Sequence, residues 1–234
     1  MIQLKQIEIG YQHTLFRIPQ LQLEKGGVYI LIGKNGAGKS TFLKTLTGES
    51  TPKAGNILLQ DRPLNEYTTK ELARFISFVP SKTHAADFLS VYDFVALGRS
   101  PFTSMMGILS QEDKEVINDA IENVGLGDFI HRELISLSDG EKQLASVAKA
   151  IAQETEILLL DEPTAFLDYS NRIKMLDLLK DLSKNKGKCI VFSSHDIDIC
   201  LESGESLILI NQSTGELELT DQQIGKDYIL KNTF

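Results

Sequence analysis

The sequence has little cysteine, no excess of positive charge and no long apolar run. Its two cysteines, Cys189 and Cys200, lack the spacing of metal ligands, so buried and reduced thiols are the simpler expectation. The formal net charge of −8 argues against sequence-independent binding of nucleic acid. No apolar run approaches the ~20 residues that a membrane-spanning helix needs, and residues 1–5 do not resemble a signal peptide. We therefore expect no nucleic-acid partner and no direct membrane insertion, so any role at a membrane requires a protein partner.

The most informative stretch is Gly33–Ser40, which has the glycine, lysine and serine spacing of a phosphate-binding loop. An apolar, β-rich run, Val28–Ile32, precedes it, and a helical pattern, Thr41–Thr47, follows it. Glycines let backbone amides turn toward an anion, and the helix N-terminus adds the positive end of its dipole. A glycine-rich turn with a chance Lys-Ser pair is the alternative. The flanking strand and helix favour a site for a nucleotide.

Within this loop, the Lys39 side chain can reach the β- and γ-phosphates, and the Ser40 hydroxyl can coordinate Mg²⁺. The expected nucleotide contacts are Gly33, Lys34, Asn35, Gly36, Ala37, Gly38, Lys39, Ser40 and Thr41.

Alternation of strand and helix patterns predicts an α/β fold with a mainly parallel sheet. The expected strands are residues 2–9, 15–23, 28–32, 56–60, 75–79, 157–160, 189–193 and, as the last strand, 207–210. The expected helices are residues 41–47, 69–74, 91–97, 112–124, 141–153, 169–184 and a short one in the tail, 221–229. Residues 84–153 are mostly helical, which indicates a helical insertion within the α/β core.

Polar residues follow two further apolar strands, as the phosphate-binding loop does. Asp161 and Glu162 come directly after residues 157–160, and His195 comes just after residues 189–193. Ligands bind α/β sheets beyond the carboxyl ends of the strands, so these groups are expected to meet at one edge. Asp161 is suited to hold Mg²⁺, Glu162 to polarise the attacking water, and His195 to contact the γ-phosphate or orient that water. A helix cap and a structural histidine are the alternatives.

Two other features have both a structural and a functional interpretation. Tyr11 lies in a turn ahead of the loop, where an aromatic side chain more often packs than binds, yet it is a candidate for stacking on a base. Ser138 and Glu141 have the spacing of a capping box, which alone would explain both residues. A helix N-terminus capped in this way also presents free amides to an anion.

Together these residues resemble an ATP-binding cassette (ABC) ATPase over nearly the whole chain. Six motifs carry the resemblance: Walker A at Gly33–Ser40, Walker B at Ile157–Asp161 with Glu162 after it, the LSGGQ/E signature at Leu137–Glu141, the D-loop at Ala165–Asp168, the switch histidine at His195 and the adenine-stacking aromatic at Tyr11. The resemblance implies a P-loop NTPase core with an N-terminal antiparallel β subdomain and an inserted α-helical subdomain. We expect one ABC ATPase domain over residues 1–234, with residues 84–153 as the helical part and residues 1–83 and 154–234 as the remainder.

The resemblance also implies a second copy of the chain as a partner. In the family, the signature of one subunit closes the ATP site of the other, and this chain has one loop and one signature. We expect a head-to-tail dimer with ATP sandwiched between the copies. The residues acting on the partner's site would be Ser138, Asp139, Gly140 and Glu141, with Asp168 in the D-loop beside them.

Two positions depart from the family pattern. Ser81 stands where the family has a glutamine that contacts Mg²⁺ and the permease, and Asp139 replaces the usual second residue of the signature, glycine. Serine reaches less far than glutamine. A carboxylate near a γ-phosphate would repel it, so we expect the Asp139 side chain to point away. Our hypothesis is slower turnover with ATP binding retained.

Within the family, Val95–Phe102 resembles the ALGR-x-P stretch of importers for iron-siderophores, haem and cobalamin. This implies an ATP-hydrolysing subunit that works with transmembrane permease subunits, as a peripheral protein on the cytoplasmic face of the plasma membrane. Residues 80–105 would carry much of the permease contact. Two alternatives stay open: a soluble ABC ATPase acting outside transport, for example in iron–sulfur assembly, and a weakly hydrolysing ATP-dependent scaffold.

Overall fold

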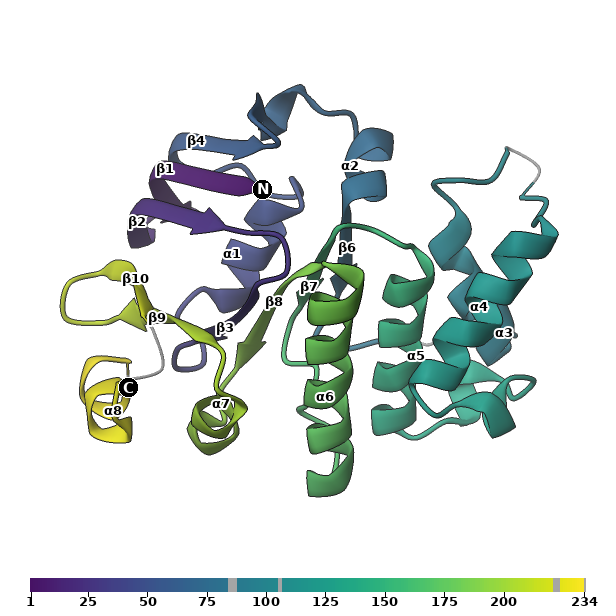
Figure 1. Ribbon diagram of the computed structural model, residues 1–234. Helices are drawn as coiled ribbons and strands as arrows, with labels where there is room; N and C mark the ends of the chain where they lie inside the picture. Colours follow the sequence, from purple (N-terminus) through teal and green to yellow (C-terminus); the bar gives the residue numbers. More distant parts are fainter. Residues whose placement is uncertain (84–87, 105–106, 221–223, 234) are drawn as a thin grey trace.

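A computed structural model describes residues 1–83, 88–104, 107–220 and 224–233, in which ten strands form one sheet (Figure 1). The order across the sheet is β5-β4-β1-β2-β10-β9-β3-β8-β7-β6. The strands are β1 (Ile2–Gly10), β2 (Thr14–Leu23), β3 (Val28–Ile32), β4 (Ala54–Leu59), β5 (Arg62–Pro63), β6 (Ile76–Val79), β7 (Ile157–Leu160), β8 (Cys189–Ser194), β9 (Ser206–Asn211) and β10 (Glu216–Thr220).

Helices cover both faces of this sheet. They are α1 (Lys39–Leu46), α2 (Thr69–Phe75), α3 (Val91–Ala96), α4 (Gln111–Asn123), α5 (Asp139–Ala152), α6 (Tyr169–Lys186), α7 (Ile197–Ser203) and α8 (Lys226–Thr233). Short 3-10 turns occur at Leu64–Glu66, Leu97–Arg99, Gly127–Phe129 and Leu134–Ser136. None of the helices in the described residues is long and apolar enough to cross a membrane.

The sheet combines the two pairing patterns that the sequence predicts. β9, β3, β8, β7 and β6 are parallel to one another, whereas β1 pairs antiparallel with β2 and β4, and β10 pairs antiparallel with β9. Side chains alternate between the faces along the fully buried strands. In β3, Ile30 and Ile32 pack with the apolar cluster that includes α5, α6 and α7, while Tyr29 and Leu31 pack with the cluster around α1. A continuous apolar run is therefore what a strand covered on both faces needs.

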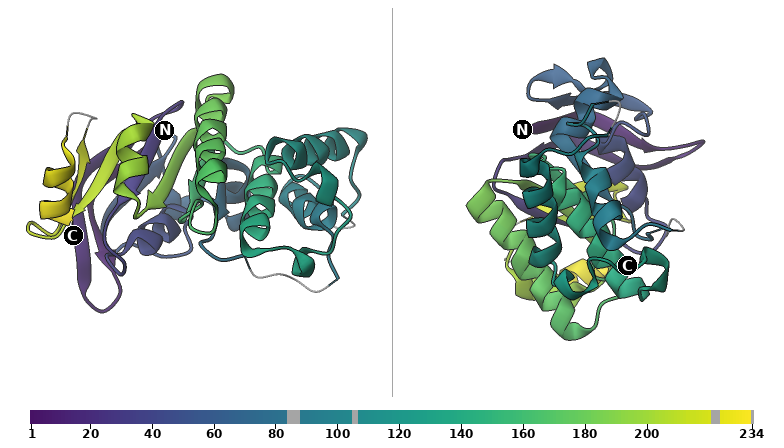
Figure 2. Two further views of the ribbon diagram at one scale, coloured as in Figure 1. Left: turned by 90° about the horizontal axis from the view of Figure 1, so that it is seen from below. Right: turned by 90° about the vertical axis from the view of Figure 1, so that its right-hand side faces the viewer.

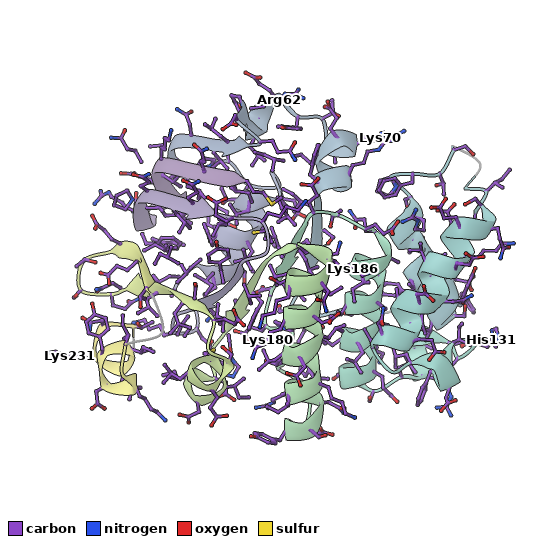
Figure 3. The ribbon with its side chains drawn as sticks, in the orientation of Figure 1. Arg62, Lys70, His131, Lys180, Lys186 and Lys231 are labelled. Atoms are coloured by element: carbon purple, nitrogen blue, oxygen red, sulfur yellow. The ribbon has the colours of Figure 1, made fainter. Side chains whose placement is uncertain are left out.

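Helix α6 illustrates how the sequence pattern sets the packing. Its buried side chains include Met175, Leu176, Leu179 and Leu182, and Asp168 caps its start. Lys180 and Lys186 belong to the same helix but lie outside this apolar set (Figure 3). The helix ends at Gly187, whose φ of 65° is the left-handed conformation typical of a helix C-terminus.

Helices α3, α4 and α5 pack on one another and project from one end of the molecule (Figure 2). A single arginine ties them together: the Arg99 Nε donates to Asp113 Oδ1 at 2.7 Å, and its Nη1 donates to the Ala152 carbonyl at 2.8 Å and to Glu154 Oε2 at 2.7 Å. Hydrogen bonds from Ser110 and the ion pair with Arg99 lower the pKa of Asp113 to about 2, so this carboxylate is ionised at neutral pH.

The ALGR-like stretch is therefore divided between the interior and the surface. A Cβ on Gly98 would lie 2.3 Å from the Lys149 carbonyl oxygen, so glycine allows the close approach to α5. Arg99 is 6% exposed, whereas Leu97 and Phe102 are 51% and 42% exposed. Gly98 and Arg99 therefore stabilise the packing of this region, whereas Leu97 and Phe102 are exposed.

Several expected boundaries need correction. The strand at 207–210 is not the last, because Glu216–Thr220 forms β10 antiparallel to β9. Helix α7 was not expected, although Asp196 caps its start and Gly204 ends it with a φ of 71°. Phe75 ends α2 rather than starting β6, and residues 97–99 of the expected helix and loop form a 3-10 turn.

Two expected boundaries fall on residues that are not described. The junction at residue 84 lies outside the described part of the chain. The same holds for residues 221–223 of the expected tail helix, and α8 begins at Lys226.

Replacing Arg99 with leucine should lower the free energy of unfolding by about 3 kcal/mol, because it leaves the buried Asp113 carboxylate without its cation. The matched control is Arg17→Leu, which removes the Arg17–Glu8 pair, where the arginine side chain is 61% exposed. This exposed pair is screened by solvent, so its loss should change the stability far less than the loss of Arg99. Urea denaturation of both variants provides the comparison, and equal losses would contradict the structural role assigned to Arg99.

Candidate functional site

The phosphate-binding loop opens onto a cavity of about 490 Å³. The residues that line this cavity come from segments far apart in the sequence. They are Tyr11, Leu15, Asn35, Gly36, Gly38, Lys39, Ser40, Thr41, Ser81, Asp161 and Glu162. Tyr11 is 68% exposed here, as a side chain free to meet a planar ligand would be. The structure thus brings together most of the residues that the sequence singles out.

The loop has the backbone shape that its glycines predict. Gly36 and Gly38 have φ values of 82° and 102°, which L side chains rarely adopt. A Cβ on Gly38 would also lie 3.0 Å from side-chain atoms of Leu15 and Phe16. Helix α1 begins at Lys39, directly after the loop, so its unpaired N-terminal amides face the same region.

Lys39 lies inside the loop rather than in solvent. Its Nζ donates to the Gly33 carbonyl at 2.6 Å and to the Lys34 carbonyl at 3.3 Å, and its side chain is 5% exposed. Burial lowers the pKa of Lys39, while the carboxylates of Glu162 and Asp161 act in the opposite direction. The ammonium is held where a phosphate oxygen could replace these carbonyl partners.

Glu162 lies between two nitrogen-bearing side chains. Its Oε1 is 3.7 Å from Lys39 Nζ, and its Oε2 is 3.3 Å from His195 Nδ1. The side chain of Glu162 is 24% exposed and that of His195 is 53% exposed, so a water molecule can reach both. The three residues follow β3, β7 and β8, as the sequence predicts, and meet at one edge of the sheet.

Asp161 is 4% exposed, and its carboxylate is held by a residue that sequence reasoning missed. The Ser193 hydroxyl donates to Asp161 Oδ1 at 2.7 Å and accepts a hydrogen bond from the Glu162 amide at 2.9 Å. Leu160 of β7 pairs with Phe192 of β8, so the next residues along, Asp161 and Ser193, are adjacent. Only the order of strands in the sheet reveals this contact, which explains why the sequence alone did not.

The oxygen groups near the loop suit one kind of metal ion. Among the described residues, no group of three or more His, Cys, Asp or Glu side chains could hold a metal by itself. Ser40 and Asp161 line one cavity and offer a hydroxyl and a carboxylate oxygen. Mg²⁺ is commonly bound by one or two protein oxygens together with substrate phosphates and water, and this donor set fits it.

The Ser138–Glu141 segment forms the capping box that its spacing predicts. Ser138 Oγ accepts from the Glu141 amide at 3.3 Å, and Glu141 Oε2 accepts from the Ser138 amide at 2.7 Å. The Ser138 hydroxyl also donates to Glu141 Oε2 at 2.6 Å, and this hydrogen bond, together with the one from the Ser138 amide, lowers the pKa of Glu141. The Asp139 side chain is 77% exposed and lies 3.9 Å from Lys142 Nζ.

The capping-box segment does not share the cavity of the phosphate-binding loop. None of residues 138–141, all of them described, lines that cavity. Asp139 instead lines a smaller one of about 150 Å³ with Lys82, Thr83 and Phe166. The N-terminus of α5 therefore does not lie at the phosphate-binding loop of its own chain.

The segment that follows β6, residues 80–83, is hydrogen-bonded to α5. The side chains that make these hydrogen bonds were not among the predicted site residues. Gln143 Nε2 donates to the Pro80 carbonyl at 3.3 Å, and the Thr83 hydroxyl donates to Ser146 Oγ at 2.7 Å. Ser81 lies between these two contacts and lines the loop cavity. The two hydrogen bonds join the cavity wall to the capped helix.

A second unforeseen link connects the residues around Asp168 and His195. Asp168 Oδ1 accepts from the Asn171 amide at 2.8 Å and so caps α6. Arg172 donates to the Leu167 carbonyl at 2.8 Å and to Asp196 Oδ2 at 3.1 Å. Asp196 is the residue after His195 and caps α7, so Arg172 bridges the two loops.

Cys189 and Cys200 are buried and free, as expected. Burial raises the pKa of each thiol to about 12, so neither is a ready nucleophile or metal ligand.

Comparison with known proteins adds to this geometry. A family model described as ABC transporter matches residues 16–165. The iron(3+)-hydroxamate import ATP-binding protein FhuC of Bacillus subtilis is 34% identical over 231 residues, which cover 98% of this chain and 86% of FhuC.

Two solved structures are similar over nearly the whole chain. An inward-facing putative metal-chelate type ABC transporter has a chain with a TM-score of 0.81 and 30% identity, covering 95% of this chain and 83% of that one. The dimeric structure of MJ0796, a bacterial ABC transporter cassette, has a TM-score of 0.84 and 25% identity, covering 96% of this chain and 100% of that one.

Proposed function

Since this chain belongs to the ABC transporter family and is an ABC-type ATPase, we propose that it powers the uptake of an iron chelate or of cobalamin through a membrane permease. The observation that carries the proposal is the 34% identity to FhuC, an import protein for iron(3+)-hydroxamate, over 98% of this chain. The similarity to a metal-chelate type transporter supports the same substrate class. A siderophore, haem or cobalamin is the expected cargo, and the permease and its receptor would select among them.

In this proposal, the phosphate-binding loop holds the triphosphate of ATP. Its amides and the Lys39 ammonium would neutralise the β- and γ-phosphates, with Gly33–Thr41 as the binding segment. Tyr11 would stack on the adenine, because its exposed ring lines the same cavity.

Hydrolysis requires a positioned water and a base to accept its proton. Glu162 would accept that proton, and His195, 3.3 Å away, would orient the water or contact the γ-phosphate. Ser40 and Asp161 would hold Mg²⁺, which when bound neutralises phosphate charge.

A second copy would complete each ATP site. The capped start of α5 lies away from the loop of its own chain, so Ser138–Glu141 would act on the partner's ATP, beside the D-loop residue Asp168. The dimeric structure of the cassette MJ0796 supports a pairing of two copies. ATP then joins the two copies, and its hydrolysis releases them.

The permease would dock on residues 80–105, from the cytoplasmic face of the membrane. Leu97 and Phe102 are exposed apolar side chains within that stretch. Arg99 connects them to the end of α5, the helix that carries the signature at its start. Movement of α5 at the ATP site would in this way reach the permease.

The proposed function is tested by co-expressing the chain with candidate importer permeases from its own organism and purifying the complex from membranes. Iron-chelate uptake into vesicles should then require ATP and the receptor protein. An ABC ATPase that stays soluble and never co-purifies with a permease would contradict the proposal and favour a role outside transport.

Glu162→Gln should slow ATP hydrolysis by about 100-fold or more while leaving an ATP-stabilised dimer, because the amide cannot accept the water's proton. Size-exclusion chromatography with ATP and Mg²⁺ would reveal the dimer. Glu202→Gln, an exposed position in α7, serves as the control and should hydrolyse ATP normally. A Glu162→Gln protein that stays monomeric with ATP, even alongside the permease, would argue against the ATP-sandwiched pair.

Ser81→Gln and Asp139→Gly restore the family's usual residues and should each raise the ATPase rate with little change in ATP affinity. The reasons are the longer reach of glutamine at the cavity wall, where Ser81 lies, and the loss of a carboxylate that in our proposal would be near the partner's γ-phosphate. Steady-state phosphate release measures the effect and also tests the scaffold alternative. Unchanged rates in both variants would count against our hypothesis of slowed turnover.

A further inference from the structure

Ser193 contacts both Asp161 and Glu162, the two adjacent residues that supply the carboxylates of the candidate site. It is 0% exposed, and no solvent reaches its hydroxyl. Within the described residues, this hydroxyl makes one hydrogen bond as donor and one as acceptor: it donates to Asp161 Oδ1 at 2.7 Å and accepts from the Glu162 amide at 2.9 Å. A single side chain therefore joins the carboxylate of one residue to the backbone of the next.

The sheet explains why this contact forms. Tyr29, Leu31, Cys189 and Val191 all pack on the face that carries α1 and the phosphate-binding loop. Ser193 continues the alternation of Cys189 and Val191, so its side chain points to the same face. Asp161 continues the alternation of Ile157 and Leu159 and reaches that face one strand away.

The second hydrogen bond lies at an unfavourable backbone conformation. Glu162 has a φ of 49°, in the left-handed region that residues other than glycine seldom occupy. This turn carries the chain out of the sheet and allows the Glu162 carboxylate to lie between Lys39 and His195. The Ser193 Oγ accepts the amide hydrogen at that turn and stabilises it.

The side chain at this position must donate one hydrogen bond, to Asp161, and accept another, from the Glu162 amide. A hydroxyl group does both. Alanine would leave the Glu162 amide without this partner and would remove a donor from the buried Asp161 carboxylate. Partners of this kind orient metal-binding carboxylates, and losing one typically reduces metal affinity or activity 10- to 100-fold.

We propose that Ser193 is a positioning residue for ATP hydrolysis, which fixes the Asp161 carboxylate toward the metal and the Glu162 side chain toward the water. This inference rests on the roles proposed above for Asp161 and Glu162. Ser193 does not itself touch ATP or the metal, so its removal changes how those two carboxylates are presented.

The test compares Ser193→Ala with Ser193→Thr, which keeps the hydroxyl, and with Ser183→Ala. Ser183 is 1% exposed and donates to the Gly26 carbonyl at 2.7 Å, so it is an equally buried serine in another hydrogen bond. Urea denaturation would establish how far each change destabilises the chain. Mn²⁺ serves as the metal probe, with its affinity for the ATP-bound protein measured by electron paramagnetic resonance.

We expect Ser193→Ala to weaken Mn²⁺ binding and to lower the hydrolysis rate, each about 10- to 100-fold. Its affinity for ATP in EDTA should stay within about twofold of the native value, because the loop and Lys39 are unchanged. Ser193→Thr should recover most of both losses. Should Ser193→Ala fail to fold, Ser193→Cys replaces it, since a thiol is a weak donor and should give an intermediate loss.

The proposal is overturned if Ser193→Ala binds Mn²⁺ and hydrolyses ATP like Ser183→Ala, or if its only defect is lower stability. It is also overturned if threonine, in a folded protein, restores neither quantity. A native chain without ATPase activity would instead refute the proposed function, while the Mn²⁺ affinities would still decide whether Ser193 positions Asp161.

Discussion

The structure depends on one buried ammonium group held at the edge of a parallel sheet. Lys39 is almost fully enclosed, with its charge directed at the carbonyl of Gly33 and toward the carboxylate of Glu162. An enclosed cation next to unpaired helix amides is costly unless an anion or carbonyl oxygens satisfy it. In our proposal the triphosphate of ATP is that anion, and the remaining residues of the cavity surround the position that it occupies.

The sheet brings the reacting groups to this cation from distant parts of the sequence. β3, β7 and β8 are parallel neighbours, so the residues that follow them meet at one edge. The capped start of α5 does not line the cavity at this edge, and in our proposal it acts on the ATP site of a second copy. Dimer formation, hydrolysis and permease contact are therefore linked in our account through α5, which Gln143 and Ser146 attach to the cavity wall and Arg99 to the outward-facing Leu97 and Phe102.

The sequence alone predicts the elements that carry local signals. The phosphate-binding loop, the capping box at Ser138 and the apolar strands are recognisable because a few adjacent residues determine each. Helix α7 and strand β10 had signals as well, in the cap at Asp196 and the alternation of Glu216–Leu219, but each is short and half-exposed. Boundaries such as that of Phe75 shift because the helix and the strand follow one another without a turn.

Contacts between distant segments could not be predicted in this way. The Ser193–Asp161 bond requires knowing that β7 and β8 are neighbours in register, and the burial of Arg99 requires knowing that α4 and α5 both pack on it. Such contacts depend on strand order and helix packing, which no local pattern specifies. They are also the contacts that separate the interior part of the ALGR-like stretch from its exposed part.

The most direct test of this account is a titration of the purified native chain with labelled ATP, beside Lys39→Ala and Lys44→Ala. Lys44 is an exposed lysine of the same helix and controls for loss of charge. We expect micromolar to millimolar binding by the native chain and by Lys44→Ala, and at least a tenfold loss of affinity, about 1.4 kcal/mol, for Lys39→Ala. Equal affinity of Lys39→Ala and the native chain, or no binding by either, would contradict the central role of the buried ammonium.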